Sequence, residues 1–105
     1  MADTRTSLIH GVIVEETMQF TLIDLCRACR AECEQLIALV DEGVLQPSGG
    51  TPQEWVFGGT SLRRARAALR LGRDLDLNAT GVALVLDLLD EIEALRARLQ
   101  RLGQR

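Results

Sequence analysis

The chain has 105 residues, of which 47% are hydrophobic, 3% aromatic and 26% charged, with a formal net charge of −3. This length fits one compact domain, and the scarcity of aromatic side chains favours a core of packed helices over a β-sandwich. The mildly acidic balance argues against a nucleic-acid-binding protein, which normally has a strongly basic surface.

The sequence has no feature of a secreted or membrane protein. Residues 1–7 are polar and lack the apolar run of a signal peptide. No apolar stretch approaches the roughly 20 residues that a membrane-spanning helix needs. The cysteine count of three is odd, and two cysteines lie three positions apart on an expected helix, unlike a secreted disulfide framework. We therefore expect a cytoplasmic protein.

The first segments predict a strand and a short helix. After a polar leader of residues 1–11, the β-branched run of residues 12–14 indicates a strand. Thr21 is placed to cap a helix from residue 22 to about residue 28, with Asp24 as a short form of the capping-box acid. The expected inner face of this helix consists of Leu22, Leu25, Cys26 and Cys29.

A second helix and a small β-wing are expected next. The helix begins at Glu32 and stops at Gly43, because glycine is a common residue at helix ends. Its expected apolar stripe consists of Cys33, Leu36, Ile37 and Val40. Residues 44–47 end in proline, which favours an extended conformation before it. A turn at residues 48–52 leads to a short strand at residues 55–57, which we expect to close a hairpin with the extended segment.

Two further helices complete the chain. Thr60 or Ser61 is expected to cap a third helix that runs to about Asp74. Its inner side consists of Leu62, Ala65, Leu69 and Gly72. Asn78 is suited to capping a fourth helix of residues 79–102. This helix has apolar residues at alternating spacings of three and four, typical of a coiled-coil seam: Val85, Leu88, Ile92, Leu95, Leu99 and Leu102.

This order of elements is that of a winged helix-turn-helix of the MerR type. We therefore predict a mainly α fold in which residues 12–77 form a MerR-like winged helix-turn-helix with a small β-wing. Residues 78–105 are predicted to be a long C-terminal helix of the same domain that serves dimerisation. The expected helix-turn-helix turn contains Arg30 and Ala31, where a glycine would be more usual.

The charges of the second helix argue against DNA binding. A recognition helix needs donors that reach bases and phosphates, but this segment has four carboxylates and no basic residue. Such a surface is repelled by a polyanion. The third helix has a basic stripe of Arg63, Arg66, Arg70 and Arg73. This stripe fits a solvated or internally paired face, a dock for an acidic partner, or a contact with DNA phosphates. A MerR-like DNA-binding regulator is therefore the alternative function, and direct DNA binding is not the expected one.

The cysteines and the one histidine do not predict a reactive centre. Cys26, Cys29 and Cys33 form one group, but a structural zinc site needs four ligands, and His10 lies in the leader. We expect free thiols that behave as small hydrophobic side chains, and no metal or cofactor. His10 has no evident triad partners, and no glycine-rich phosphate loop is present. No catalytic residue is identified, and we do not expect an enzyme.

Several motifs resemble the chaperone modulatory protein CbpM family. They are the wing Glu54-Trp55-Val56-Phe57, the Leu69-Arg70-Leu71 segment, residues 74–77, the Gly81-Val82-Ala83-Leu84 start of the last helix and residues 86–92, together with the upstream Phe20-Thr21, Leu25-Cys26 and residues 43–47. The resemblance covers about residues 12–102. It implies a dimeric protein that has a MerR-like fold but does not regulate transcription. Such proteins bind the J-domain of a DnaJ-like co-chaperone, CbpA, and inhibit both its stimulation of DnaK and its DNA binding.

The resemblance gives the acidic second helix a partner. J-domains present a basic helix to DnaK, and opposite charges favour fast encounter. The expected J-domain-binding residues are Glu32, Glu34, Asp41 and Glu42, with Leu39 expected to be exposed nearby. The alternative is that these acids are merely solvated.

The last helix predicts a homodimer. Acids occupy its first half, at residues 87, 90, 91 and 93, and arginines its second half, at residues 96, 98, 101 and 105. An antiparallel pair brings each acidic half beside a basic half, in addition to the match of these charges with the helix dipole. The expected dimer seam consists of Leu88, Ile92, Leu95 and Leu99. The alternative is that the stripe packs on its own domain.

Overall fold

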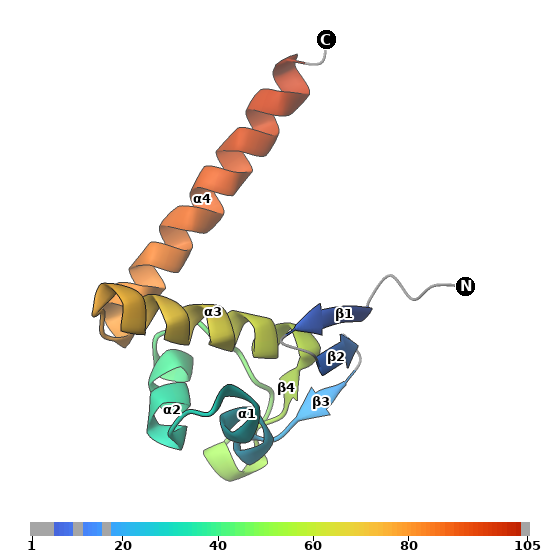
Figure 1. Ribbon diagram of the computed structural model, residues 1–105, viewed down its shortest axis with the longest axis vertical. Helices are drawn as coiled ribbons and strands as arrows, with labels where there is room; N and C mark the ends of the chain where they lie inside the picture. The colour runs from blue at the N-terminus through green and yellow to red at the C-terminus, as the bar shows by residue number, and fades with distance from the viewer. Residues whose placement is uncertain (1–5, 10–11, 16–17, 104–105) are drawn as a thin grey trace.

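A computed structural model describes residues 6–9, 12–15 and 18–103 of the chain. Its helices are α1 (Leu22–Cys29), α2 (Cys33–Asp41), α3 (Gly59–Leu75) and α4 (Ala79–Gly103), and its strands are β1 (Thr6–Ile9), β2 (Val12–Glu15), β3 (Gln19–Phe20) and β4 (Phe57–Gly58), with a 3-10 turn at Pro52–Glu54. The first three helices form a body from which α4 projects as a long arm (Figure 1). The predicted mainly α fold is confirmed. None of the described helices combines the length and apolar character that crossing a bilayer requires.

The caps predicted for the first and last helices are present. The backbone N–H of Asp24 donates to Oγ1 of Thr21 at 3.1 Å, and the N–H of Thr21 donates to Oδ2 of Asp24 at 3.2 Å, which completes a capping box. At the start of α4, the N–H of Gly81 donates to Oδ1 of Asn78 at 2.8 Å. Both helices therefore begin where local side chains satisfy their first backbone donors.

The predicted cap of α3 is wrong by two or three residues. This helix begins at Gly59, after an extended Gly58, so that Thr60 and Ser61 lie inside its first turn. It ends at a residue in the left-handed region, Asp76 (φ 54°), whose N–H donates to the carbonyl of Gly72. The reason for the early start is that Gly59 is buried and directly follows β4, so the chain turns from strand into helix without a linker.

The turn between α1 and α2 holds an arginine in a backbone conformation that favours glycine. Arg30 has φ 53° and ψ 46°, and its N–H donates to the carbonyl of Arg27 at 3.2 Å. The N–H of Ala31 donates to the carbonyl of Cys26 at 3.1 Å. A non-glycine residue in this region costs about 1 kcal/mol. The expected tight turn is therefore present, at a small cost in backbone strain.

The core lies where α1, α2, β4 and α3 meet the first two turns of α4. Its buried residues are Leu25, Cys26, Leu36, Leu39, Val44, Leu45, Phe57, Leu62, Ala65, Ala68, Val82 and Leu86. Leu39, which we expected to be exposed, has only 3% of its surface exposed, so this prediction is wrong. The reason is the rotation of α2 about its own axis, which decides which side chains face the core. Its buried face is centred on Leu36 and Leu39, three residues apart, while Ile37 is only half-buried.

The wing pairs differently from the prediction. The expected hairpin between residues 44–47 and 55–57 is reduced to one bridge, between Ser48 and Val56, with N–H···O distances of 3.1 and 2.9 Å. Strand β4 pairs instead with β3, antiparallel, with Phe57 opposite Phe20. This distant pairing places the Phe57 ring in the core, where it is fully buried. Burial of a large aromatic side chain outweighs the local hairpin.

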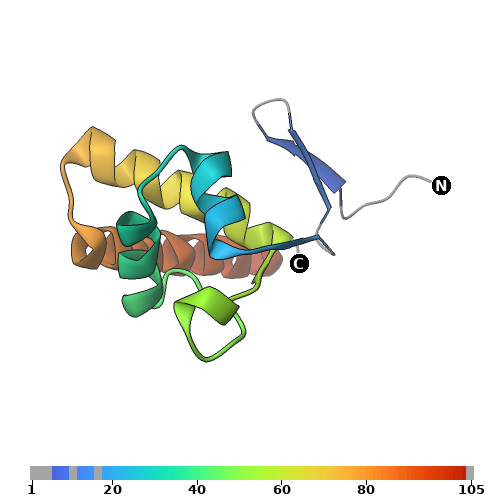
Figure 2. The same ribbon diagram turned by 90° about the horizontal axis from the view of Figure 1, so that it is seen from below.

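The N-terminal segment contains a second strand that the sequence did not predict. The strand expected at residues 12–14 is confirmed as β2, and it pairs with β1 from Thr6 opposite Glu15 to Ile9 opposite Val12. The expected polar leader of residues 1–11 therefore includes a strand, and its boundary falls within a hairpin. Figure 2 shows this hairpin beside the helical body rather than inside it. His10 lies outside the described residues.

Candidate functional site

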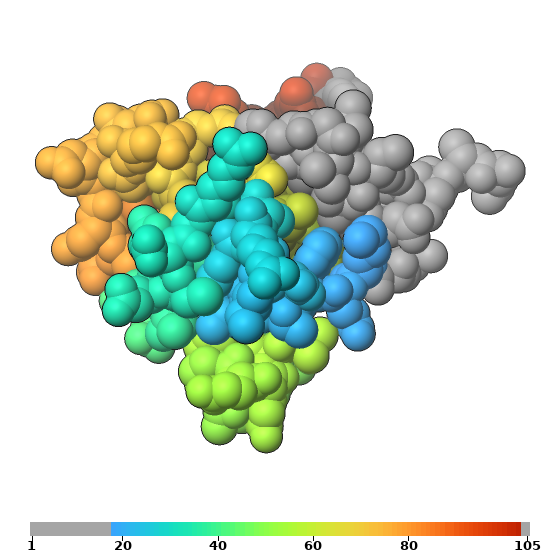
Figure 3. Space-filling model, turned by 60° about the horizontal axis from the view of Figure 1, so that its bottom comes forward, coloured from blue at the N-terminus to red at the C-terminus, as the bar shows by residue number. Residues whose placement is uncertain are grey.

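The acids of α2 do not all lie on one face. Glu34 and Asp41 are seven residues apart, two turns of helix, so they share a side of α2 and both are exposed. Half-buried Ile37 lies between them on the same side. We call Glu34, Ile37 and Asp41 the acidic face. Figure 3 looks onto the side of the molecule where α2, in teal, lies next to the wing segment, in yellow-green.

The other two predicted acids have different surroundings. Glu32 is exposed at the N-terminal end of α2, where its N–H donates to Oε1 of Gln35 at 2.9 Å. Glu42 caps the other end of the helix, and its Oε2 accepts a hydrogen bond of 3.0 Å from the hydroxyl of Thr80 in α4. Of the five residues predicted for this site, the structure thus brings Glu34 and Asp41 together, places Glu32 and Glu42 at the helix ends, and buries Leu39.

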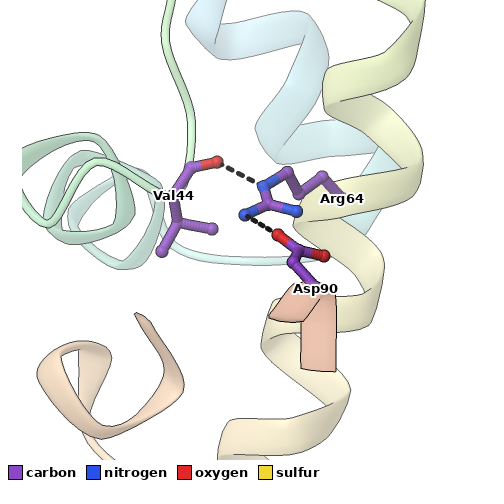
Figure 4. A network of polar contacts seen from close by, with 3 residues as sticks. All are labelled: Val44, Arg64 and Asp90. Atoms are coloured by element: carbon purple, nitrogen blue, oxygen red, sulfur yellow. Dashed lines mark hydrogen bonds and ion pairs between the residues drawn. The ribbon is translucent and has the colours of Figure 1, made fainter. Parts of the chain in front are cut away.

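Arg64 links the body to α4, a role that no local feature of the sequence predicts. Its Nε donates to the carbonyl of Val44 at 2.8 Å, and its Nη2 lies 3.7 Å from Oδ2 of Asp90 (Figure 4). One guanidinium therefore joins α3, the segment after α2 and the fourth turn of α4. Arg64 lies beside the basic stripe in the sequence, and only its distant partners distinguish it from the neighbouring arginines.

The basic stripe of α3 is partly structural. The Nη2 of Arg66 donates to the carbonyl of Ala28 and so joins α3 to the end of α1. The Nε of Arg73 lies 3.8 Å from Oδ1 of its neighbour Asp74, and both side chains are mostly exposed. Arg63 and Arg70 also have interaction partners. The interpretation as an internally paired face therefore holds for Arg66, while Arg73 remains accessible at the surface.

The three cysteines are free thiols, as predicted. Only 7% of the Cys26 surface is exposed. Burial raises the pKa of Cys26 to about 12, and a hydrogen bond with Cys33 and the nearby thiols act in the same direction. Burial also raises the pKa of Cys29, while the Arg66 charge opposes that rise. Thiols with raised pKa values are poor nucleophiles and poor metal ligands. No cluster with metal-ligand spacing occurs within the described part of the chain.

The apolar stripe of α4 does not pack on its own domain. Near the start of α4, Val82 and Leu86 are buried in the core, and Ala79 and Ala83 pack against it. Beyond them the predicted seam residues are 44% to 67% exposed: Leu88, Ile92, Leu95 and Leu99. The alternative that this stripe packs within its own domain is therefore contradicted. An exposed apolar stripe of this length is typical of a protein-binding surface.

Comparison with known proteins agrees with this architecture. A family model described as MerR HTH family regulatory protein matches residues 20–104, which confirms the predicted MerR-like fold. A chaperone modulatory protein CbpM of Coxiella burnetii is 37% identical over 95 residues, 90% of each chain. Proteins of the same name from Pseudomonas entomophila and Pseudomonas putida are each 36% identical over 88 residues, 84% of this chain and 87% of theirs.

Proposed function

The chain belongs to the family of chaperone modulatory proteins CbpM, and we propose that it is a non-enzymatic cytoplasmic inhibitor of a CbpA-type, DnaJ-like co-chaperone. In this proposal it binds the J-domain of that co-chaperone and lowers both its stimulation of DnaK and its DNA binding. The family membership supports a chaperone partner. The surface of α2 supports the choice of a basic one.

The acidic face is the observation that carries the proposal. Glu34 and Asp41 are exposed on either side of Ile37, and α2 has no basic residue that would offset their charge. A J-domain presents a basic helix to DnaK, so opposite charges would steer the encounter. The half-buried Ile37 supplies an apolar contact at the centre, the role that we first gave to Leu39. A J-domain bound in this way would have its DnaK-binding helix blocked sterically.

We also propose that the protein acts as a homodimer through α4. The exposed apolar stripe that includes Leu88, Ile92 and Leu95 would be shielded from water by a second copy of α4. When two copies pair antiparallel, the acidic first half of each helix lies beside the basic second half of the other. Because Asp90 also contacts Arg64, the proposed dimer helix is anchored to the body that holds the acidic face. Two J-domain sites would then be held at a fixed separation.

The test is calorimetric titration of the full chain with an isolated J-domain of a DnaJ-like protein from the same organism. We expect saturable binding at one J-domain per chain. Glu34→Lys combined with Asp41→Lys should weaken binding by at least tenfold, about 1.4 kcal/mol. The matched control is Glu54→Lys combined with Asp74→Lys, an equal charge reversal at two exposed acids that lie outside both α2 and α4. Equal affinity for the α2 double variant would contradict the acidic face as the docking site.

The second candidate is a MerR-like DNA-binding regulator, which the family model and the basic stripe favour. Its weakness is that α2, the helix in the position of a recognition helix, would bring Glu34 and Asp41 against phosphates. Salt-sensitive retardation of a palindromic operator by the wild-type chain would support this candidate. An adaptor that binds only protein should give no retardation at any salt concentration.

A further inference from the structure

A groove of about 460 Å³ lies on the side of α2 that faces α3 and α4. Residues of the α1–α2 turn, of α2, of the end of α3 and of the start of α4 line it. Its lining is mainly small and aliphatic, with Ala38, Leu39, Ala68, Leu69, Leu77 and Val82. Apolar grooves of this size, with a few charged groups at the edge, are typical ligand and peptide sites.

Arginines lie along one edge of this groove. Arg30, from the α1–α2 turn, and Arg73, from the last turn of α3, both line it. A second hollow of about 110 Å³ shares Cys29, Leu69 and Arg73 with the groove and adds two more arginines of the basic stripe, Arg66 and Arg70. We call the two hollows together the arginine-edged groove. Positive charge from α3 and from the α1–α2 turn thus lies beside an apolar floor.

Two of the arginines at this edge, Arg66 and Arg73, are incompletely paired among the described residues. The Nε of Arg66 is buried and has no hydrogen-bond partner among the described residues, although its Nη2 donates to Ala28. A buried donor without a partner is rare in native proteins and costs about 1–3 kcal/mol. The pair between Arg73 and Asp74, at 3.8 Å and mostly exposed, is of the kind that contributes little in water. The exposed Arg73 can therefore gain from an added carboxylate.

We propose that the arginine-edged groove binds an acidic peptide segment that carries one large aliphatic side chain. The aliphatic side chain fits the floor around Ala38 and Leu69, and the flanking carboxylates pair with Arg30 and Arg73. A guanidinium holds a carboxylate through two parallel N–H···O bonds, which gives direction as well as affinity.

The groove is distinct from the acidic face, although both involve α2. Gln35, Ala38 and Leu39 point to the groove side, whereas Glu34 and Asp41 lie on the adjoining side of the helix. This arrangement favours a peptide over DNA. A narrow acidic segment can lie in the groove without passing the two carboxylates, but a phosphate backbone extends across the surface and would meet them. Because the groove and the acidic face lie on different sides of α2, peptide binding and J-domain binding can be tested separately.

The experiment follows the backbone amides of the full chain by NMR during titration with a synthetic peptide, a leucine flanked on each side by two glutamates and blocked at both ends. We expect saturable shifts at the groove residues Gln35, Leu69 and Gly72, and weaker binding as salt increases. The same peptide with glutamines in place of its glutamates should bind about tenfold more weakly. Equal binding of the two peptides, or shifts that avoid the groove, would overturn the proposal.

Two variants separate charge from shape. Arg30→Gly with Arg73→Gln removes two cations, and glycine suits the left-handed conformation at residue 30, so the variant should fold. It should bind the acidic peptide about tenfold more weakly. Ala38→Met should also weaken binding, because it fills the groove and leaves every charge in place. The control is Arg96→Gln with Arg98→Gln, an equal charge loss on the exposed part of α4, which should leave peptide binding unchanged.

A DNA arm completes the test. A short duplex is titrated under the same conditions, and we expect no shifts at the groove residues. If the duplex instead shifts the amides of Leu69 and Gly72 and the peptide does not, the arginines serve phosphates and the peptide proposal is wrong.

Discussion

The hydroxyl of Thr80, in the first turn of α4, donates a hydrogen bond of 3.0 Å to Oε2 of Glu42 at the C-terminal end of α2. This hydrogen bond links α2, the proposed docking helix, to α4, the proposed dimer helix. It also gives Glu42 a structural partner, which separates it from the exposed Glu34 and Asp41.

We expect Thr80→Val to lower the free energy of unfolding by about 0.5–1 kcal/mol, because the bond is solvent-exposed and only one hydroxyl is lost. Glu42→Gln should have a similar effect and should change J-domain affinity by less than about twofold. Urea unfolding of the two single variants and the double variant forms a cycle. Strictly additive losses would show that the bond does not contribute to stability.

Leu39 and Ile37 form a matched pair of aliphatic residues on α2 whose substitution should have different effects. Leu39→Ala should lower the free energy of unfolding by about 2–5 kcal/mol, since it leaves a cavity in the core. Ile37→Ala should lower it by less, since that side chain is only half-buried, and it should weaken J-domain binding. Denaturation and calorimetry on both variants check this contrast. Unchanged J-domain affinity of Ile37→Ala would contradict the place of Ile37 in the docking surface.

Alkaline pH should destabilise the protein through its thiols. The pKa of Cys26 is raised from 9.0 to about 12 in the folded chain, so the folded state keeps a proton that the unfolded state loses. This contribution to stability is fully present below about pH 9 and is lost as the pH rises from there towards 12. The chain has no Lys and no Tyr, so few other groups titrate in this window.

Urea unfolding at a series of pH values measures this effect. The urea midpoint should fall above pH 9, and Cys26→Ala should reduce the slope, because that variant lacks the shifted thiol. The pKa of Cys29 is raised too, so a smaller slope should remain. A midpoint that does not depend on pH in the wild type would be inconsistent with a protonated, buried Cys26.

The proposed dimer depends on the exposed apolar stripe of α4. Ile92→Glu should give a monomer in sedimentation equilibrium at concentrations where the wild type is dimeric, because it places a charge at the centre of the seam. Ala97→Glu is the control, since residue 97 lies on the opposite side of the helix. The prediction fails if the wild type itself is monomeric at the highest concentration, or if both variants dissociate alike.

Arg64 should be more important for stability than its salt bridge suggests. Asp90→Asn removes only an exposed partner at 3.7 Å and should cost less than about 1 kcal/mol. Arg64→Leu also removes the donor to the carbonyl of Val44, a buried residue, and should cost about 1–3 kcal/mol. Thermal unfolding of both variants distinguishes the two contacts. Equal losses would assign the whole effect to the ion pair.

Local signals in the sequence identified the helices and most of their ends. Thr21 with Asp24, and Asn78 before α4, were predicted as caps because capping depends on residues a few positions apart. The apolar spacing of α4 correctly predicted its length. The MerR-like fold followed from the order of these elements, and the family model confirms it.

Features that depend on distant contacts were missed. The sequence favoured a local hairpin for Phe57, but its partner is Phe20, on the far side of α1 and α2 in the chain. The exposure of Leu39 was misjudged because a short helix with many apolar residues does not fix which side faces the core. In the candidate site, Glu34 and Asp41 were predicted from the charge of α2 together with the family resemblance, and the structure places both on one exposed side of the helix. The contacts of Glu42 and Arg64 require knowing where α4 lies.

Trp55, which packs in the wing, is an intrinsic fluorescence probe of that part of the protein. Trp55 lies edge-on to Phe57, with ring centroids 6.0 Å apart and planes at 86°, and the chain has no other Trp and no Tyr. Intrinsic fluorescence therefore responds only to the environment of the wing, while far-ultraviolet circular dichroism is dominated by the helices, including α4, which contains no aromatic residue. If α4 loses its helical structure when the protein is diluted, the dichroism should decrease while the tryptophan emission stays constant.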